Sequence, residues 1–282
     1  MRQIAKPNVD NGAFYLECAQ STADAGLRTR LVQTAAAVSV AAAGYIQAGH
    51  ARSWFQLAHS IQVVPASDDE LRNLYARVVV PRRRVGRKVY DKIIIGAPFG
   101  ICPLCGAGKV STVDHYLPKS VYAQFSILSE NLVPSCADCN KAKLESYPTT
   151  PQDQPFHPYF DSVEADRWLF GEVVTYQGVS VAFSVEPPGQ WSAILAARAR
   201  RHFELFRLGE FYATLAAQEL SEVRGRLEAM YQQGGADLVR DDLQLSADSA
   251  REVHINSWKT AMYDALAQDD EFCEGGFQNI GL

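Results

Sequence analysis

The sequence predicts an α+β protein in which a mostly helical scaffold surrounds a small finger stapled by a metal ion. Three observations lead to this prediction. Residues 25–47 and 194–231 are rich in helix-forming residues at helical spacing. Residues 167–190 alternate apolar and polar side chains around a Gln-Gly pair, which predicts a β-hairpin. Between these regions, two CxxC pairs enclose thirty residues, a pattern typical of a metal site.

The N-terminal region, residues 1–95, is predicted to be helical. After the alanine-rich helix at 25–47, residues 68–80 begin with three acidic residues and carry Leu71, Leu74 and Val78 at helical spacing. Proline lacks the backbone N–H that a helix interior needs, so Pro81 should end this second helix.

The most apolar stretch of the chain, residues 31–48, is predicted to be a packed helix rather than a membrane span. Alanine dominates it, and Gln33, Thr34, Ser39 and Gln47 interrupt it. The polar opening MRQIAKPNVDN does not resemble a signal peptide. We therefore expect a cytoplasmic protein with no membrane association.

Two further regions complete the predicted organisation. Residues 96–162 contain both cysteine pairs and a proline-rich loop at 147–161, whose four prolines forbid a helix. Residues 163–282 begin with the hairpin and continue into two or three amphipathic helices. The chain thus divides into a helical region, a central region and a C-terminal region of hairpin plus helices.

The net charge of −5 does not suggest a nucleic-acid-binding protein, but the charge is unevenly distributed. Residues 81–92 carry six Lys or Arg residues against one Asp. A phosphate-binding surface needs local positive charge rather than a basic average. The expected contacts to nucleic acid in this run are Arg82, Arg83, Arg84 and Arg87. A solvated face or a surface for a protein partner is the alternative.

The cysteine spacing predicts a structural zinc site. Four thiolates form a closed tetrahedral site, and each CxxC turn places two sulfur atoms on one side of the ion. The expected ligands are Cys102, Cys105, Cys136 and Cys139. A redox pair or an iron–sulfur cluster would use similar cysteines, but neither explains the Asp-His pair and the two asparagines that accompany them.

These residues resemble the HNH nuclease motif, the ββα-metal finger in its zinc-stapled form. The resemblance covers the stretch from CPLC at 102–105, through VDHYLP at 113–118, to CADCNKAK at 136–143. His115 and Asn131 are sixteen positions apart, and nine positions separate Asn131 from Asn140. HNH domains of RNA-guided DNA-cutting effectors show similar separations. The resemblance implies a zinc-stapled ββα-metal finger with DNA phosphodiester hydrolysis as its activity, and the predicted helical flanks would form the scaffold around it.

The residue types suit that chemistry. A neutral His115 can accept a proton from the attacking water. Asp114 and Asn140 offer oxygen ligands for a catalytic Mg²⁺ or Mn²⁺. Because adjacent strand residues point to opposite faces, the strand should end or twist at Asp114. Asn131 should hold the following loop through backbone hydrogen bonds, and Lys143 should contact phosphate.

Two weaker candidates accompany this set. Lys119 is a second possible phosphate contact. His157, held between Pro155 and Pro158, is either a residue that packs a turn or an additional metal ligand or phosphate contact.

Three functions are compatible with the sequence. Phrases such as NLVPSCADCNKAK and FHPYFD are similar to bacterial HNH proteins of anti-phage defence loci, including the nuclease subunit of Septu-type and retron-associated systems. That resemblance implies a DNA-cutting effector with a partner ATPase. The alternatives are a stand-alone restriction or repair nuclease, and a zinc module that binds nucleic acid or protein without cutting.

Overall fold

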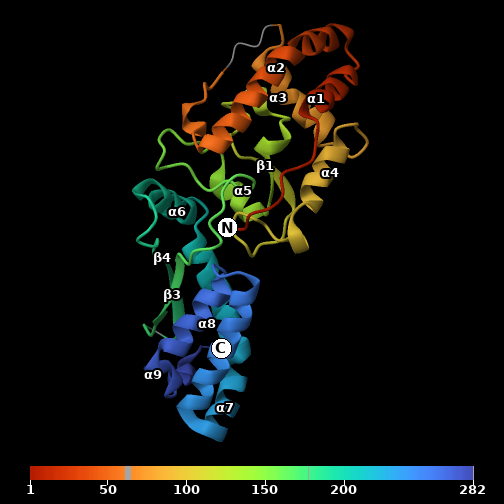
Figure 1. The fold of residues 1–282 in the computed structure, drawn as a ribbon. Helices are drawn as coiled ribbons and strands as arrows, with labels where there is room; N and C mark the ends of the chain where they lie inside the picture. The colour runs from red at the N-terminus through yellow and green to blue at the C-terminus, as the bar shows by residue number, and fades with distance from the viewer. Residues whose placement is uncertain (61–64, 177, 282) are drawn as a thin grey trace. The chain divides into compact units, whose positions relative to one another are not determined.

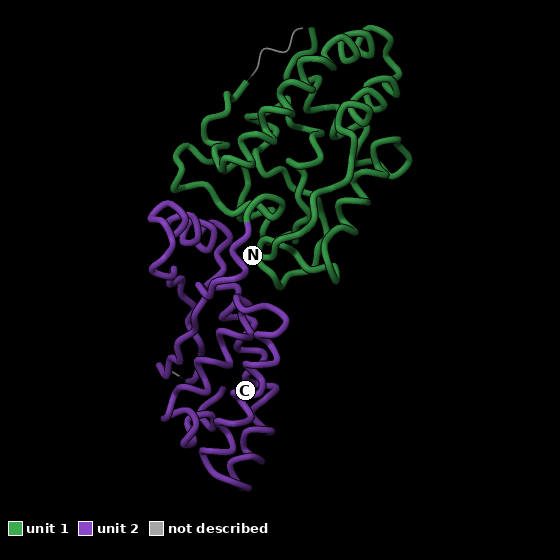
Figure 2. Tube along the Cα trace, in the orientation of Figure 1, with its two compact units in different colours: residues 1–161 green, residues 162–282 purple. Residues whose placement is uncertain are grey.

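The computed structural model describes residues 1–60, 65–176 and 178–281, which form two compact units. The first unit spans residues 1–161 and the second spans residues 162–282 (Figure 2). The predicted border at 95/96 lies inside the first unit, and the border at 162/163 lies beside the division. Each unit has its own buried hydrophobic residues.

The α+β class is confirmed. The described residues contain two antiparallel sheets of two strands each, and helices make up most of the remaining regular structure (Figure 1). Five short 3₁₀ helices connect these elements in the part of the chain described. They are Trp54–Gln56, Pro98–Gly100, Ala123–Phe125, Ser129–Asn131 and Gly276–Asn279.

The first unit begins with helices α1, Asn11–Gln20, and α2, Ala25–Ala51, which pack against each other (Figure 1). Side chains cap both N-termini, because Asp10 accepts a hydrogen bond from Ala13 N and Asp24 accepts one from Leu27 N. Helix α2 is long and apolar enough to cross a membrane, as core helices of many proteins are. Within the structure, 39% of its most apolar window is buried.

Helix α3, Asp68–Leu74, starts with a capping box in which Ser67 and Glu70 exchange hydrogen bonds. It continues as a π-helix, Tyr75–Val79, which ends shortly before Pro81 as the sequence predicts. Helix α4, Arg87–Ile95, follows the loop at residues 81–86, which contains three arginines and is called the basic loop. Leu71, Leu74 and Val78 are buried in the core of this unit, together with α1, α2 and α4 residues.

The finger consists of strand β1, Thr112–His115, strand β2, Leu132–Ser135, and helix α5, Ala137–Lys143. The strands are antiparallel, with Asp114 opposite Val133 and His115 opposite Leu132. Helix α4 packs against both strands, and α5 packs against β1 (Figure 1). No helix forms within the described proline-rich loop at 147–161.

The second unit combines the predicted hairpin with helices. Strands β3, Leu169–Val174, and β4, Ser180–Val185, pair in antiparallel register, and the Gln177 of the predicted turn lies outside the described residues. Helix α6 spans Ala193–Leu205, and α7 spans Leu208–Val253 with a break at Gly235, whose φ is 67°. The hairpin packs against α7 and α8, Trp258–Gln268, and the short α9, Asp270–Cys273, follows.

Candidate metal centre and active site

The first cysteine pair lies in a tight turn that precedes β1. Cys102 N donates a hydrogen bond to Gly108 O over 2.7 Å, and Gly106 N donates to Cys102 O over 2.8 Å. Gly106 has a φ of 70°, which glycine adopts without steric cost. This backbone pattern brings both sulfur atoms to one side of the turn.

The second pair lies at the N-terminus of α5. Cys136 is the cap residue of that helix, and its Sγ accepts a hydrogen bond from Cys139 N over 3.4 Å. The two turns approach closely at Gly108, where an added Cβ would lie 3.0 Å from both Cβ and Sγ of Cys136. A side chain at position 108 would therefore push the two cysteine pairs apart.

The four sulfur atoms form a group that could hold a metal ion. All of them lie within 4.8 Å of one another, and Cys105 Sγ is 3.9 Å from Cys136 Sγ. A tetrahedral zinc site with bonds of about 2.3 Å has sulfur–sulfur distances of roughly 3.8 Å. The four cysteines are fully buried, and no other cluster of His, Cys, Asp and Glu suited to a metal was found among the described residues.

Asp114 projects from β1 toward α5, where it faces Lys143. Its Oδ1 accepts a hydrogen bond from His115 N over 2.7 Å, and its Oδ2 lies 3.8 Å from Lys143 Nζ. Burial raises the pKa of Asp114, whereas the nearby Lys143 opposes that rise. Burial likewise lowers the pKa of Lys143, against the attraction of Asp114.

The position of Lys143 differs from the sequence-based expectation. We expected its ammonium group to contact phosphate, but the side chain is only 3% exposed. Lys143 ends α5 on the face that packs against β1, so its charge meets Asp114 instead of solvent. In the structure, Lys143 is the buried ion-pair partner of the Asp114 carboxylate.

His115 occupies the other face of β1. We expected the strand to end or twist at Asp114. It does not end there, because the pairing with β2 continues through His115 and the two side chains alternate as strand residues do. The imidazole packs edge-on against Tyr75, with ring centroids 4.5 Å apart, and its Nε2 lies 2.8 Å from Ser126 O. Burial lowers the pKa of His115 to about 3, so the ring is neutral near pH 7.

The hydrogen bond to Ser126 fixes the tautomer of that neutral ring. A carbonyl oxygen can only accept, so Nε2 carries the proton and Nδ1 carries the lone pair. Nδ1 has no protein partner among the described residues. The nitrogen that can take up a proton is therefore Nδ1.

Asn131 binds the loop between β1 and β2. Its side-chain amide donates to Leu117 O over 3.0 Å and to Phe125 O over 3.1 Å, while its Oδ1 accepts from Leu117 N over 2.7 Å. The residue is completely buried. Asn131 thus holds in place the loop that carries Ser126, the partner of the His115 ring.

Asn140 lies on α5, three residues before Lys143 and therefore on the same side of the helix. It is partly exposed, and its side-chain amide has no hydrogen-bond partner in the described part of the chain, whereas its backbone N donates to Cys136 O. Since Lys143 faces Asp114, Asn140 sits one helical turn away on the side that packs against β1.

His157 lies inside an aromatic cluster of the first unit. Its ring stacks on Trp54 with centroids 4.8 Å apart. Its Nδ1 accepts a hydrogen bond from Tyr159 N, and its Nε2 lies 3.1 Å from Tyr45 Oη. Both ring nitrogens are engaged and the residue is fully buried, so we do not include His157 in the metal site. These contacts agree with the first of the two roles expected for His157, that of a residue that packs a turn.

The basic run contains both exposed and engaged side chains. Arg82, Arg83 and Arg84 are exposed. Arg87 instead pairs with Asp91 over 2.8 Å and stacks on the ring of Tyr90. Lys119, in the loop after β1, is partly exposed.

Tyr75 and Ser126 are contacts of the candidate site that the sequence did not identify. Tyr75 belongs to the π-helix, and its hydroxyl donates a hydrogen bond to Val113 O over 3.3 Å. The helical spacing of apolar residues in the sequence indicates only that Tyr75 is a core residue of a helix. Ser126 contributes a backbone oxygen, for which side-chain identity gives no signal.

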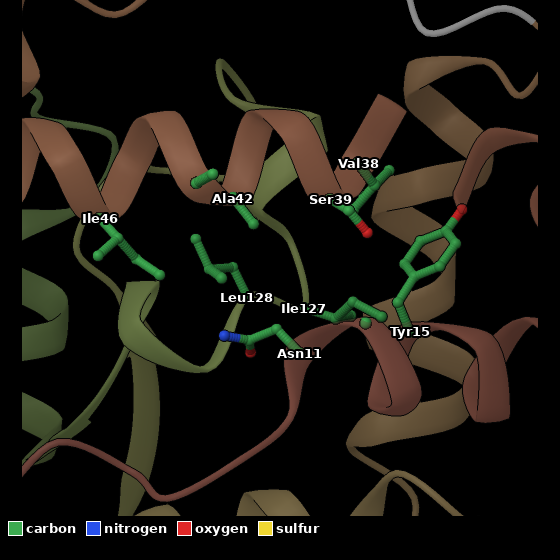
Figure 3. Close-up of a pocket in the computed structure, with 10 residues that line it drawn as sticks. Asn11, Tyr15, Val38, Ser39, Ala42, Ile46, Ile127 and Leu128 are labelled. Atoms are coloured by element: carbon green, nitrogen blue, oxygen red, sulfur yellow. The ribbon is translucent and has the colours of Figure 1, made fainter. Parts of the chain in front are cut away.

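A small cavity lies behind the loop that carries Ser126. Its volume is about 220 Å³, and Figure 3 shows Ile127 and Leu128 of this loop facing Tyr15 of α1 and Ala42 of α2 across it. The polar side chains at the cavity are those of Asn11 and Ser39, and the hydroxyl of Tyr15 donates a hydrogen bond to Leu31 O over 3.0 Å. Asn11 is engaged, since it bonds to Glu130 and to Ser129 N.

Taken by its fold and site, the chain is an α+β protein with a four-cysteine cluster that could hold a metal ion. It is similar to Protein ea31 of Escherichia phage lambda, with 29% identity over 73% of this chain and 74% of the phage protein. No family model matches the chain, and no solved structure matches it.

Proposed function

We propose that the chain is a metal-dependent endonuclease of the HNH kind that hydrolyses DNA phosphodiester bonds. The supporting observation is the neutral ring of His115, held through Nε2 by Ser126 O and left with a free Nδ1. His115 directly follows Asp114 in β1, the first strand of a strand–strand–helix unit. The order of Asp114, His115, Asn131 and Asn140 along that unit matches the HNH resemblance.

In this proposal, Asp114 and Asn140 hold a Mg²⁺ or Mn²⁺ ion through side-chain oxygen atoms. When bound, such an ion supplies charge neutralisation at the phosphate and at the departing oxygen. Carboxylate Oδ2 of Asp114 has no hydrogen-bond partner within the described residues, so a lone pair remains available. His115 Nδ1 takes the proton of the attacking water as its oxygen bonds to phosphorus and the bond to the leaving sugar oxygen breaks.

The four cysteines have a structural role in this proposal, with zinc as their ion. Zinc would connect the turn before β1 to the N-terminus of α5, because each contributes one cysteine pair. Since Asn140 follows Cys139 directly, this connection would fix the position of Asn140 relative to β1. The cysteine site is thus proposed to hold the parts of the finger in register.

A plasmid-cleavage assay tests the proposal. We expect purified protein to nick or cut supercoiled DNA with Mg²⁺ or Mn²⁺, and we expect Asp114→Asn and His115→Ala to lose at least a hundredfold in rate, the lower range for a general base. Asp138→Asn is the matched control, because this exposed acid lies on α5 of the same finger but is not part of the proposed site. Cleavage that survives in both site variants would refute the proposal, as would DNA left intact by the wild type with every metal.

We further propose that the nuclease is the cytoplasmic effector of an anti-phage defence system and works with a partner ATPase. The support is the resemblance of the finger and its flanking segments to nuclease subunits of such systems. Plaque counts on cells that express the chain with its genomic neighbours test this role. Protection should disappear with Asp114→Asn, and protection unaffected by that substitution would separate defence from cutting.

A further inference from the structure

A cleft of about 420 Å³ opens in the first unit, away from the cysteine cluster. It is formed by the turn between α1 and α2, the first turns of α2, helix α3, the π-helix and the basic loop. Its lining residues are Ser21, Thr22, Ala23, Asp24, Leu27, Leu31, Glu70, Asn73, Leu74, Arg77, Val78 and Arg84. None of these residues is a proposed catalytic residue or metal ligand, and only Arg84 is among the expected nucleic-acid contacts.

The lining combines an apolar part with two cationic groups. Leu31, Leu74 and Val78 are buried core residues that also line the cleft. Arg77 and Arg84 are exposed at it, and in the described ranges neither guanidinium has an ion pair or a side-chain hydrogen bond.

Neighbouring arginines behave differently, which makes these two distinctive. Arg72 pairs with Asp69, and Arg87 pairs with Asp91. Unpaired guanidinium groups retain all five N–H donors, in a planar arrangement that suits phosphate oxygens. Arg77 and Arg84 both line the cleft, so an anion in it could accept charged hydrogen bonds from their guanidinium groups.

The two carboxylates of the cleft are already engaged. Asp24 caps α2 by accepting a hydrogen bond from Leu27 N. Glu70 pairs with Arg30 and accepts a hydrogen bond from Ser67 N, and its pKa is lowered chiefly by the hydrogen bond from Arg30. Their negative charges are therefore partly neutralised. Thr22 adds a hydroxyl oxygen that is buried without a hydrogen-bond partner among the residues described.

We propose that this cleft binds a nucleotide, with its phosphate between Arg77 and Arg84 and its base over the apolar lining. The volume lies within the range of small-molecule sites, about 300–1,000 Å³. A ligand of only one chemical kind would contact only part of the lining. Inorganic phosphate would leave the apolar surface uncovered, and an apolar ligand would leave both guanidinium groups unpaired.

The cleft also borders the element that packs against His115. Arg77 and Val78 belong to the π-helix Tyr75–Val79, and Tyr75 of the same five residues contacts the His115 ring. π-helical turns are rare and often mark functional sites. A nucleotide that fixes Arg77 and Val78 would thereby fix the ring that covers His115. The effect on His115 rests on the proposed nuclease function, whereas nucleotide binding in the cleft does not.

Binding is tested with the full chain by calorimetry and thermal melting, using AMP, ATP, adenosine, inorganic phosphate and a ten-residue oligothymidylate as probes. We expect AMP or ATP to bind and to raise the melting temperature, as a ligand selective for the folded state must. Adenosine and phosphate alone should bind at least tenfold more weakly. Arg77→Ala and Arg84→Ala should each weaken nucleotide binding at least tenfold, a typical effect of losing a charged hydrogen bond.

Arg83→Ala is the matched control, because Arg83 is exposed in the same loop but does not line the cleft. Absence of nucleotide binding at millimolar concentration overturns the proposal, and so does equal weakening by all three substitutions. Binding of the oligonucleotide without competition from AMP or ATP would also overturn it. These measurements need no DNA cleavage, so they stand or fall independently of the proposed nuclease activity.

The link to His115 has its own readout. In protein labelled at histidine, saturating nucleotide should shift the ring signal of His115, assigned from its absence in His115→Gln. The Tyr75→Ala variant should still bind nucleotide but lose that shift. An unchanged His115 signal in the nucleotide-bound wild type would refute the link.

Discussion

The ammonium group of Lys143 lies 3.8 Å from carboxylate oxygen Oδ2 of Asp114, and both atoms are buried. Neither has a hydrogen-bond partner among the described residues. Each charge is therefore compensated mainly by the other, at a distance longer than a hydrogen bond. Removal of one partner should leave the other charge buried and uncompensated.

The first prediction concerns this pair. In urea unfolding at pH 7.5, Lys143→Met should lower the free energy of unfolding by about 3 kcal/mol, because Asp114 then lacks its counter-charge. The double variant Asp114→Asn with Lys143→Met should recover most of that loss. If the two substitutions were simply additive, Lys143 would contribute packing alone and the ion pair would have no energetic role.

The Asp114–Lys143 pair shows what could not be predicted from the sequence. The CxxC spacing identified all four members of the sulfur cluster, because the ligand pattern is local at each end. Asn140 and Lys143 are three positions apart, a spacing that puts both on one side of a helix. However, helical spacing does not tell which side faces the strand, so a residue expected to contact phosphate is instead buried against Asp114.

Long-range packing explains the remaining differences. The proline-rich segment correctly predicted a loop without helix, but nothing in it reveals that His157 stacks on Trp54, about a hundred residues earlier in the chain. Likewise, Leu71 and Tyr75 have ordinary helical spacing, yet the helix widens into a π-helix at Tyr75 and packs against His115. Such contacts join segments that no sequence pattern relates to each other.

The second prediction tests the cysteine cluster. Cys136→Ser should remove the bound metal and lower the melting temperature, because a structural metal contributes its binding energy to folding. Metal content measured by atomic emission should fall from about one ion per chain to near zero. Cys18→Ala is the control, since Cys18 is buried in the same unit but outside the cluster. Equal metal content in both variants would contradict the prediction.

The third prediction concerns the pH dependence of stability at His115. The folded-state pKa of about 3 is below the unfolded value of 6.5, because burial disfavours the charged ring. The stabilisation is complete above pH 6.5 and decreases as the pH falls, since the unfolded chain then binds the extra proton. Between pH 6.5 and 3, this group alone should cost about 1.4 kcal/mol for each pH unit.

His115→Gln provides the comparison, because glutamine has no proton to bind in this range. The difference in unfolding free energy between the two proteins should therefore change steadily between pH 7 and 5. Both proteins retain the cysteine cluster, so acid-induced metal loss affects both alike. Parallel stability curves would mean that the His115 ring titrates normally and is not held in its buried site.

The fourth prediction concerns the turn that follows α5. Leu144 has φ 47° and ψ −123°, and Ser146 N donates a hydrogen bond to Lys143 O over 2.9 Å. These angles belong to the first central position of a type II′ turn, which strongly favours glycine. The Leu144 side chain is 70% exposed, so little packing offsets the backbone strain. Leu144→Gly should therefore stabilise the protein by about 1 kcal/mol.

Leu144→Ala separates backbone strain from the effect of removing an exposed apolar side chain. Alanine retains the Cβ that disfavours positive φ, so this variant should gain almost nothing in urea unfolding. If alanine and glycine stabilised equally, exposure of the leucine rather than its backbone conformation would be the cause. Because Leu144 directly follows Lys143, a gain specific to glycine would show that the strain is stored next to the Asp114 pair.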